Sequence, residues 1–316
     1  MKYRCVDRGG MRCPCGLMKA DQCYVCTLSR TGKCDCSADW QGVCPYNEYL
    51  QGAENPADGR TLPQEFFAEI TGIKNYSEQL SAVSLAVSRG FTWRCRRPGS
   101  FIMASALGCR TPLSVLRTGF CYGKCECEKE STAGGWIEIA LQPAGPKTKE
   151  LVRLAEQTAD CGKKSWRIAG PFEAGLLNIE RLNMEEPMTV IAKGTAIAPF
   201  LNIMESIDED KKMNIRLLID EDKLTEDFLE EYLRDSWERV SLAEDTEKII
   251  SAIDDSSQIM LLASPYFTEK YSGLRPGRKG DIITANHANM CCGAGICGAC
   301  SFTDADGITV RRCKCV

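Results

Sequence analysis

The stretch MTVIAKGTAIAPFLNIMESI, residues 188–207, places a short apolar run before a glycine-containing turn and a helix-like run. Three further apolar runs follow, NIRLLID, RVSLA and QIMLLAS, and the first two precede the helix-like runs LTEDFLEEYLRDS and TEKIISAIDDS. Strand-like runs that alternate with helix-like runs are typical of a parallel sheet flanked by helices. We therefore expect a parallel α/β domain over residues 169–281.

Short β-like runs dominate the sequence before this domain. The runs LSAVSLAV, SFIMAS, PLSVLR and WIEIALQ lie between residues 76 and 168, with glycine and proline between them. Many short strands separated by such turn residues indicate a small antiparallel barrel. The two patterns together predict an α+β multidomain protein in which the barrel precedes the α/β domain.

The composition limits the class of protein. A net charge of −4 argues against a protein built mainly to hold nucleic acid. No run of eighteen apolar residues is present, which argues against a membrane span, and the start MKYRCVDRGG lacks an apolar signal core. We expect a soluble, cytoplasmic protein.

Twenty cysteines and a single histidine, His287, define the expected metal chemistry. Thiols in the cytosol are kept reduced, so disulfides explain so many cysteines poorly. Thiolate-rich centres favour iron–sulfur clusters or zinc. We expect metal or cluster ligation by cysteine, with His287 in a loop and not a ligand.

A repeated cysteine spacing marks residues 1–52. The pattern C-x7-C-x-C-x7-C occurs twice, displaced by 21 residues, and predicts two related metal modules whose bound metal supplies much of the folding free energy. Two [4Fe–4S] clusters fit the number of thiolates, and two structural zinc sites are the alternative, because the spacing does not decide between them. The predicted ligands are Cys5, Cys13, Cys15, Cys23, Cys26, Cys34, Cys36 and Cys44.

The passage PYNEYLQGAENPADGRTLPQEFF, which follows Cys44, is rich in the turn residues proline, glycine and asparagine. We assign residues 53–75 to a linker. We expect this linker to end in a short helix, with Thr61 as the N-cap and Pro63 in the first turn. The barrel then occupies residues 76–168.

Four segments, RPGSFIM, RTPLSVL, AGPKTKEL and GTAIAPF, resemble in this order the ferredoxin–NADP reductase superfamily. The resemblance covers residues 76–316. Within the superfamily, this part of the chain is similar to the iron–sulfur electron-transfer subunit of dihydroorotate dehydrogenase. It implies that RTPLS lies along the isoalloxazine of FAD, that the G-x-x-T segment at a helix N-terminus holds the pyrophosphate, and that GTAIAPF approaches NAD(H). The residues implied for cofactor binding are Arg110, Pro112, Leu113, Ser114, Gly145, Lys147, Thr148, Gly170, Gly175, Gly194 and Thr195.

The nucleotide part of this resemblance carries two departures. Ala196 stands where the family turn has a glycine, and the segment 263–265, Ala-Ser-Pro, stands where the family has Cys-Gly-Pro near the nicotinamide. Asp220 and Glu221, after the second strand, would repel a 2′-phosphate and so disfavour NADP. Both NAD(H) binding and a domain that keeps the fold without the nucleotide stay open.

The family resemblance also assigns a role to CCGAGICGAC, residues 291–300. In the family, a C-x4-C-x2-C segment followed by a fourth cysteine ligates one [2Fe–2S] cluster. Cys292, Cys297 and Cys300 reproduce the spacing, Cys313 is the expected fourth ligand, and Cys315 is its alternative. Residues 282–316 therefore form the predicted [2Fe–2S] segment, with a four-thiolate zinc site as the other interpretation.

Four cysteines near the barrel hairpin, Cys109, Cys121, Cys125 and Cys127, lie outside the family pattern. They are interpreted either as a further metal site or as reduced thiols on an inserted hairpin.

These expectations describe an oxidoreductase in which no catalytic acid, base or nucleophile is evident. The resemblance implies an electron-transfer subunit that moves electrons between NAD(H) or ferredoxin and a partner oxidoreductase through FAD and iron–sulfur clusters, as in anaerobic redox complexes. The alternative is a metal-stabilised scaffold or binding subunit that keeps the reductase fold without NAD(H) chemistry.

Overall fold

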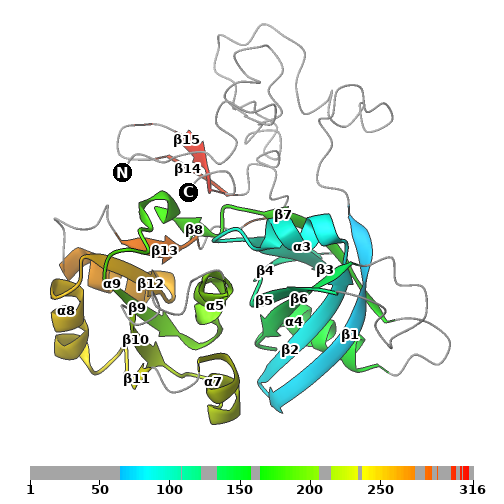
Figure 1. The fold of residues 1–316 in the computed structure, drawn as a ribbon, viewed down its shortest axis with the longest axis horizontal. Helices are drawn as coiled ribbons and strands as arrows, with labels where there is room; N and C mark the ends of the chain where they lie inside the picture. Colours follow the sequence, from blue (N-terminus) through cyan, green and yellow to red (C-terminus); the bar gives the residue numbers. More distant parts are fainter. Residues whose placement is uncertain are drawn as a thin grey trace, which may run out of the picture.

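The computed structural model describes residues 65–107, 109–121, 134–157, 164–205, 215–233, 237–274, 282–286, 290, 300–303, 307 and 309–312. These residues form an antiparallel sheet and a parallel sheet that lie side by side (Figure 1). The predicted fold class, an antiparallel barrel followed by a parallel α/β domain, is confirmed.

The antiparallel sheet is an open half-barrel. Within the described residues its seven strands follow the order β4-β3-β7-β1-β2-β6-β5, and every neighbouring pair is antiparallel. The strands are β1 (Phe66–Ser77), β2 (Leu80–Val87), β3 (Phe101–Ala106), β4 (Cys109–Ser114), β5 (Arg117–Phe120), β6 (Gly135–Leu141) and β7 (Ser165–Phe172).

One face of this sheet builds the core of the half-barrel. Strand β6 alternates buried and partly exposed residues, as expected for a sheet that is covered on one face. Helix α4 (Pro146–Glu156) closes the core, and Trp166 Nε1 donates a 3.1 Å hydrogen bond to the Leu151 carbonyl oxygen to fix the helix on β7. Helix α3 (Arg89–Cys95) buries Phe91 and Cys95 in the same apolar cluster.

The second sheet contains six strands among the described residues, in the order β11-β10-β9-β12-β13-β8. All neighbours are parallel except β13 and β8. Strands β9 and β12 are buried along nearly their whole length, which is typical of parallel strands with helices on both faces. The strands are β8 (Leu176–Leu177), β9 (Met188–Lys193), β10 (Ile215–Asp220), β11 (Glu238–Arg239), β12 (Gln258–Leu262) and β13 (Ile283–Ala285).

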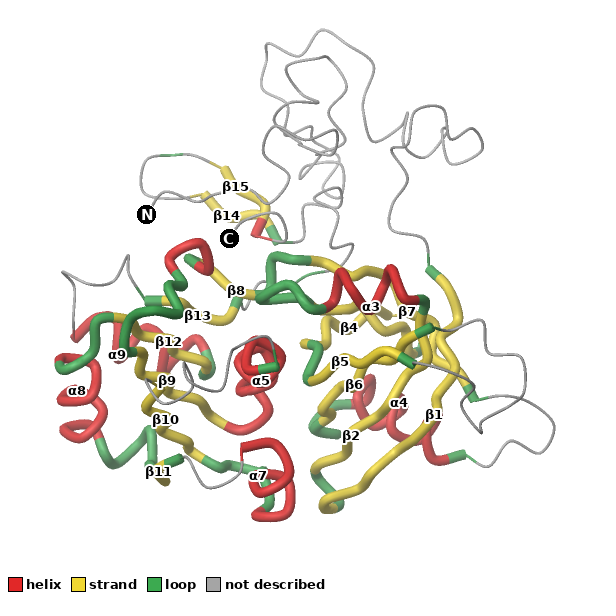
Figure 2. The backbone as a smooth tube through the Cα atoms, in the orientation of Figure 1, coloured by secondary structure: helices red, strands yellow, loops and turns green. Residues whose placement is uncertain are grey.

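Helices cover both faces of the parallel sheet. Helices α5 (Ala198–Met204) and α7 (Glu226–Leu233) lie between the two sheets, as Figure 2 shows, and pack on one face. Helices α8 (Thr246–Asp254) and α9 (Pro265–Leu274) pack on the other. The remaining elements are the 3₁₀ turns η2 (Ile179–Arg181) and η3 (Gly194–Ile197) and the pair β14 (Ser301–Thr303) and β15 (Thr309–Arg311).

Hydrogen bonds join the helical layer to the half-barrel. Tyr232 Oη donates to Glu138 Oε2 at 2.8 Å, and the Thr118 amide donates to Glu205 Oε2 at 3.0 Å. Burial raises the pKa of the Glu205 carboxyl, and the bonds from Thr118 and the charge of Arg117 oppose that rise. The two halves therefore meet through specific polar contacts as well as apolar packing.

The predicted linker helix, with Thr61 as N-cap and Pro63 in its first turn, lies outside the described residues and stays a prediction. Residues 66–75, which were assigned to the linker, instead belong to strand β1, which pairs with both β2 and β7. The described strands of the half-barrel therefore span residues 66–172, where 76–168 was expected. One pairing partner of β1, strand β7, lies far along the chain, so the local sequence did not reveal β1 as a strand.

Among the residues that the structure describes, no helix is long and apolar enough to cross a membrane.

Candidate cofactor site

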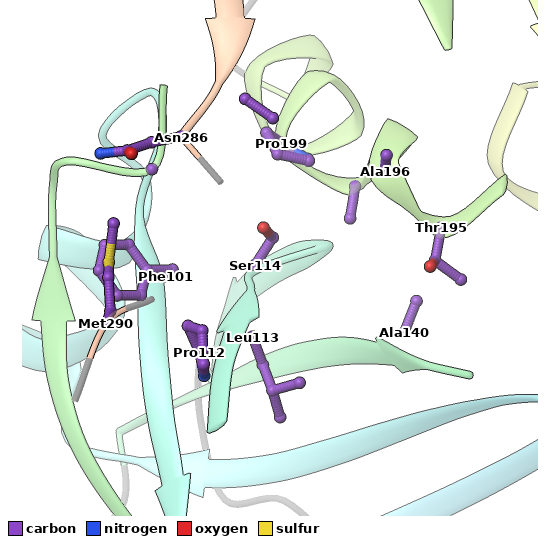
Figure 3. Close-up of a pocket in the computed structure, with 13 residues that line it drawn as sticks. Phe101, Pro112, Leu113, Ser114, Ala140, Thr195, Ala196, Pro199, Asn286 and Met290 are labelled. Carbon is purple, nitrogen blue, oxygen red and sulfur yellow. The ribbon is translucent and has the colours of Figure 1, made fainter. Parts of the chain in front are cut away.

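A cavity of about 290 Å³ lies where the half-barrel meets the α/β half. Figure 3 shows its lining residues around a common space. The lining is mostly small or apolar, with Ser114, Thr195 and Asn286 as its polar side chains. The lining residues are Phe101, Pro112, Leu113, Ser114, Ala140, Gly175, Thr195, Ala196, Ala198, Pro199, Ala285, Asn286 and Met290.

The α/β wall of the cavity lies at the carboxyl end of β9. Strand β9 pairs with β10 on one side and β12 on the other, so the strand order reverses there. Ligands of open α/β sheets bind in the crevice at such a reversal. Gly194 has φ +53°, a left-handed conformation that glycine adopts readily, and it turns the chain from β9 into η3.

The half-barrel wall comes from β4, whose last three residues, Pro112, Leu113 and Ser114, all line the cavity. Gly175 closes one end, where the chain crosses from the half-barrel to the second sheet. Its amide donates to the Gly99 carbonyl oxygen at 3.0 Å, and a Cβ on Gly175 would lie 2.3 Å from that oxygen. The crossing is therefore too close for any residue other than glycine.

Five residues predicted from the sequence meet at this one cavity, although they are up to 83 positions apart in sequence, between residues 112 and 195. They are Pro112, Leu113, Ser114, Gly175 and Thr195. Gly194 and Gly170 are not lining residues. Gly194 is the first residue of η3, which carries the lining residues Thr195 and Ala196, and Gly170 lies within β7.

The other predicted cofactor residues lie away from the cavity lining. Gly145 is the N-cap of α4, and its amide donates to Thr148 Oγ1 at 3.1 Å, so the Thr148 hydroxyl already caps the helix. Lys147 lies in the same exposed first turn. Arg110 Nε donates to Glu65 Oε1 at 2.7 Å, so its guanidinium is held by a carboxylate. A phosphate-binding role for these residues stays a prediction.

Sequence reasoning missed the lining residues Phe101, Ala140, Asn286 and Met290. Phe101 and Ala140 belong to strands that the sequence predicted. The pattern of a strand does not show, however, which of its residues line a cavity. Asn286 and Met290 lie within the predicted [2Fe–2S] segment, whose cysteine spacing gives no information about a flavin cavity.

Comparison with solved structures identifies this arrangement. A chain from the structure of the NADH-dependent reduced ferredoxin–NADP oxidoreductase, studied for flavin-based electron bifurcation, superposes with a TM-score of 0.54 at 17% identity, covering 79% of this chain and 90% of that one. This chain has a ferredoxin reductase-like fold. No protein-family model matches the sequence, and no curated protein matches it either.

Two further solved structures are similar to this chain at lower TM-scores. The ferredoxin reductase of carbazole 1,9a-dioxygenase is 14% identical with a TM-score of 0.48, covering 70% of this chain and 67% of that chain. The cytochrome b5 reductase domain of Ulva prolifera nitrate reductase is 13% identical with a TM-score of 0.45, covering 71% of this chain and 98% of that one.

Cys300, a predicted cluster ligand, is buried beside the cavity of the reductase-like fold. It shares an apolar cluster with Phe101 and Met290, which line the cavity, and with Phe172, whose ring stacks on Phe101 at 5.2 Å between centroids. The C-terminal segment therefore contributes to the packing behind the cavity wall.

Asn286 ties this segment to the cavity rim. Its side-chain amide donates to the Ala174 carbonyl oxygen at 2.8 Å and to the Arg312 carbonyl oxygen at 2.6 Å. The Arg312 amide in turn donates to the Cys300 carbonyl oxygen at 3.1 Å. Hydrogen bonds thus connect the barrel exit, the cavity rim and the segment from Cys300 to Arg312 that contains the strand pair β14 and β15.

Charged groups at the carboxyl edge of the parallel sheet are paired with one another. Lys193 Nζ lies 2.7 Å from Asp220 Oδ1, and Asp220 Oδ2 accepts a 2.9 Å bond from the Leu242 amide. Arg239 lies 2.6 Å from Glu221, and the hydrogen bond that its guanidinium donates to this carboxylate raises the pKa of Arg239. Asp220 and Glu221, predicted to disfavour NADP, are therefore both engaged by cations.

Most of the predicted metal ligands lie outside the described residues, namely Cys5, Cys13, Cys15, Cys23, Cys26, Cys34, Cys36, Cys44, Cys292, Cys297 and Cys313. Cys125, Cys127, Cys315 and His287 lie outside them too. Within the described part of the chain, no three metal-binding side chains cluster, and Cys95 is a buried thiol whose pKa burial raises.

Proposed function

We propose that this chain is an iron–sulfur flavoprotein electron-transfer subunit that binds FAD with its ring system in the cavity. The observation that carries the proposal is the convergence of RTPLS and GTAIAPF residues on one cavity at a topological switch point. A volume of about 290 Å³ is near the lower end for ligand pockets, which suits a ring system better than a whole dinucleotide. The reductase-like fold supports this assignment.

The lining residues suit a flat aromatic ring. Ala140, Gly175 and Ala198 present little side-chain volume, so an aromatic ring meets few obstructing atoms. Ser114 supplies a hydroxyl from the β4 wall that would hydrogen-bond the edge of the ring. Leu113 and Pro199 exclude water from the space between the two halves. A bound flavin exchanges an electron pair as hydride with a nicotinamide and single electrons with an iron–sulfur cluster.

The cluster assignment rests on the C-terminal cysteines. We assign Cys292, Cys297, Cys300 and Cys313 to one [2Fe–2S] cluster. The packing of Cys300 against cavity-lining residues supports electron exchange between this segment and the cavity. The front cysteines are assigned to two further clusters, with zinc as the alternative, and these extend the path toward a partner oxidoreductase.

The residues on the α/β side of the cavity favour NAD(H) as the nucleotide that exchanges electrons with the flavin. Thr195 and Ala196 line the cavity opposite residues of the β4 wall, so they would hold a nicotinamide on the α/β side of the cavity. Lys193 and Arg239 are engaged by Asp220 and Glu221, so a 2′-phosphate at this edge would meet two carboxylates, which favours NAD(H) over NADP. Electrons then pass between NAD(H) or ferredoxin and the partner oxidoreductase.

Anaerobic purification followed by flavin, iron, sulfide and zinc analysis tests this function. The expected result is one FAD and about ten iron atoms for each chain, which is the content of one [2Fe–2S] and two [4Fe–4S] clusters. Zinc without flavin contradicts the proposal and supports the metal-stabilised scaffold. Rapid bleaching of the flavin absorbance by NADH then tests direct use of the nucleotide.

A further inference from the structure

A carboxylate shared by two arginines lies on the half-barrel sheet, on the face opposite its core. Glu65 Oε1 accepts a hydrogen bond from Arg110 Nε at 2.7 Å and lies 2.7 Å from a terminal nitrogen of the same guanidinium. The other oxygen, Oε2, pairs with the guanidinium of Arg167. The Glu65 side chain keeps 13% of its surface exposed, against 26% for Arg110 and 57% for Arg167. One carboxylate thus bridges two cations and is more enclosed than either.

The strand register brings both arginines to one face of the sheet. Trp166 and Ile168 pack in the half-barrel core, so Arg167 between them points to the opposite face. Ser105 of β3 pairs with Arg167 of β7 on one side and with Arg110 of β4 on the other. Neighbouring strands lie about 5 Å apart, so the Cα atoms of the two arginines are about 10 Å apart. Their side chains reach across this distance, as the shared carboxylate shows. We call Arg110, Ser105 and Arg167 the arginine row.

The same face of the sheet continues from the arginine row to the cavity. Arg110, Pro112 and Ser114 are alternate residues of β4, and Pro112 and Ser114 line the cavity (Figure 3). Alternate residues of a strand lie on one face, about 7 Å apart. The arginine row therefore lies one step along the strand beyond Pro112, at the margin of the cavity.

The arginine row matches the part of a flavin nucleotide that the cavity does not hold. Under the proposed function, a volume of about 290 Å³ suits the ring system, so the phosphate lies outside the cavity. None of the described residues that line the cavity is positively charged. Guanidinium groups bind phosphate oxygens in a bidentate geometry. The arginine row offers two such groups next to the ring position, but Glu65 already holds both of them.

We propose that Glu65 is a built-in competitor of the flavin phosphate, which has to displace its carboxylate from Arg110 and Arg167 to bind. This inference rests on the proposed function. A carboxylate and a phosphate make the same kind of charge-assisted bond with a guanidinium, so each excludes the other from the same donors. The contact of Glu65 with the arginine row stabilises the chain without flavin and weakens the binding of flavin nucleotides.

A purely structural ion pair predicts a different outcome. In either case the contact with two arginines stabilises the folded chain, so loss of the Glu65 charge lowers its stability. A structural role leaves the flavin affinity unchanged, or lowers it together with the stability. Loss of a competitor frees the two guanidinium groups and raises the affinity for ligands that carry phosphate. Stability and affinity therefore change in opposite directions only if Glu65 competes.

The test uses the full chain with its metal centres, freed of flavin by dialysis against a chaotropic salt. Glu65→Gln keeps the shape of the side chain and removes its charge. Glu238→Gln is the matched control, because Glu238 also binds two cations, Arg216 at 2.8 Å and Lys248 at 3.2 Å, on strand β11 outside the cavity lining. Fluorescence titration measures the dissociation constants of FAD, FMN and riboflavin, which share the ring system but differ in phosphate. Thermal unfolding of the flavin-free chain measures stability.

Glu65→Gln should bind FAD and FMN more tightly, on the order of tenfold, and its flavin-free form should unfold at a lower temperature than wild type. Riboflavin, which has no phosphate, should bind within about twofold of wild type. Glu65→Asp, which keeps the charge, should stay close to wild type for all three ligands. Arg167→Gln in the Glu65→Gln background should remove most of the gain. Glu238→Gln should bind every ligand within about twofold of wild type.

Three outcomes overturn the inference: a FAD affinity that Glu65→Gln leaves unchanged or lowers, an equal gain for riboflavin, or an equal gain in Glu238→Gln. Each of these leaves the proposed function standing as long as the wild type binds FAD. A wild type and variants that bind no flavin contradict the proposed function itself. Calorimetry with inorganic pyrophosphate still tests the competition in that case, because Glu65→Gln should bind pyrophosphate more tightly than wild type whether or not a flavin binds.

Discussion

The two walls of the cavity differ in what they offer a ligand. The half-barrel wall presents small and apolar side chains, with Ser114 as its hydroxyl. Behind the α/β wall, at the carboxyl edge of the parallel sheet, Lys193 and Arg239 are bound to acidic residues of the protein itself. The half-barrel wall is therefore prepared for a ring system, whereas phosphate binding at the Lys193 edge requires an internal ion pair to break. The fold therefore indicates where a ligand binds, and the charge distribution indicates which part of the ligand each wall can accept.

Filling the half-barrel wall should have the largest effect. Ala140→Phe adds a ring to a cavity of about 290 Å³, so we expect flavin binding to weaken on the order of a hundredfold or more. The measurement is flavin content after desalting and fluorescence titration with FAD. Ala86→Phe is the matched control, because Ala86 lies on the same face of the sheet as Ala140, outside the cavity lining. Equal loss in both variants would show that the sheet, not the cavity, was damaged.

Adding a side chain at Gly175, where the chain passes from the half-barrel to the second sheet, should have the next largest effect. The effect concerns stability. A Cβ at position 175 would lie 2.3 Å from the Gly99 carbonyl oxygen, so Gly175→Ala should lower the free energy of unfolding by about 3 kcal/mol. Urea denaturation followed by circular dichroism measures this. Gly145→Ala is a control, because no atom lies within 4 Å of its added Cβ. A Gly175→Ala protein as stable as wild type would mean that the crossing can shift.

Breaking the ion pair between Lys193 and Asp220 should test whether the charges behind the α/β wall stabilise the fold or bind the nucleotide. Lys193→Met removes the ammonium 2.7 Å from Asp220, whose side chain is mostly buried, and should lower the free energy of unfolding by about 1–2 kcal/mol. Because Lys193 already holds Asp220, we expect the affinity for NADH to stay within about twofold. Denaturation and NADH titration are measured on the same sample. A large loss of NADH affinity would show that Lys193 binds the nucleotide instead.

The smallest expected effect concerns pH and the contact of Glu205 with β5. Burial raises the pKa of Glu205 in the folded state, so between the unfolded and folded pKa values the folded state binds more protons. Its contribution to stability therefore falls as pH rises through this window, and Glu205→Gln should remove that fall. The difference in unfolding free energy between wild type and variant is followed from about pH 4 to 8. A wild type that gains stability over Glu205→Gln with rising pH would contradict the assignment.

Alternation and motif order predicted most of the strands. LSAVSLAV, SFIMAS, PLSVLR and WIEIALQ correspond to β2, β3, β4 and β6, because half-buried strands carry period-two patterns. Strand β1 was missed. FFAEITGIKNYS pairs with β2 and β7, but residues 66–75 were assigned to a linker because the passage before them is rich in turn residues. Local composition says nothing about strand partners that lie far along the chain.

The sequence predicted only those cavity-lining residues that belong to recognisable motifs. Ser114 and Thr195 belong to segments with recognisable neighbours, so their chemistry was anticipated before their proximity was known. Ala140 and Asn286 have no such signal, because an alanine in a strand and an asparagine after one are ordinary. The engagement of Arg110 by Glu65 was equally invisible, because the two residues meet across strands.

The bonds of Asn286 give the end of the chain a second role. Since its amide group fastens the Arg312 backbone to the barrel exit, and Met290 and Cys300 pack behind Phe101, the described residues from Asn286 to Arg312 form part of the enclosure around the cavity. A truncated chain that ended before Asn286 would lose this side of the enclosure along with the cysteines that follow it. Chimaeras that exchange the tail between relatives must therefore transplant the cavity rim with it.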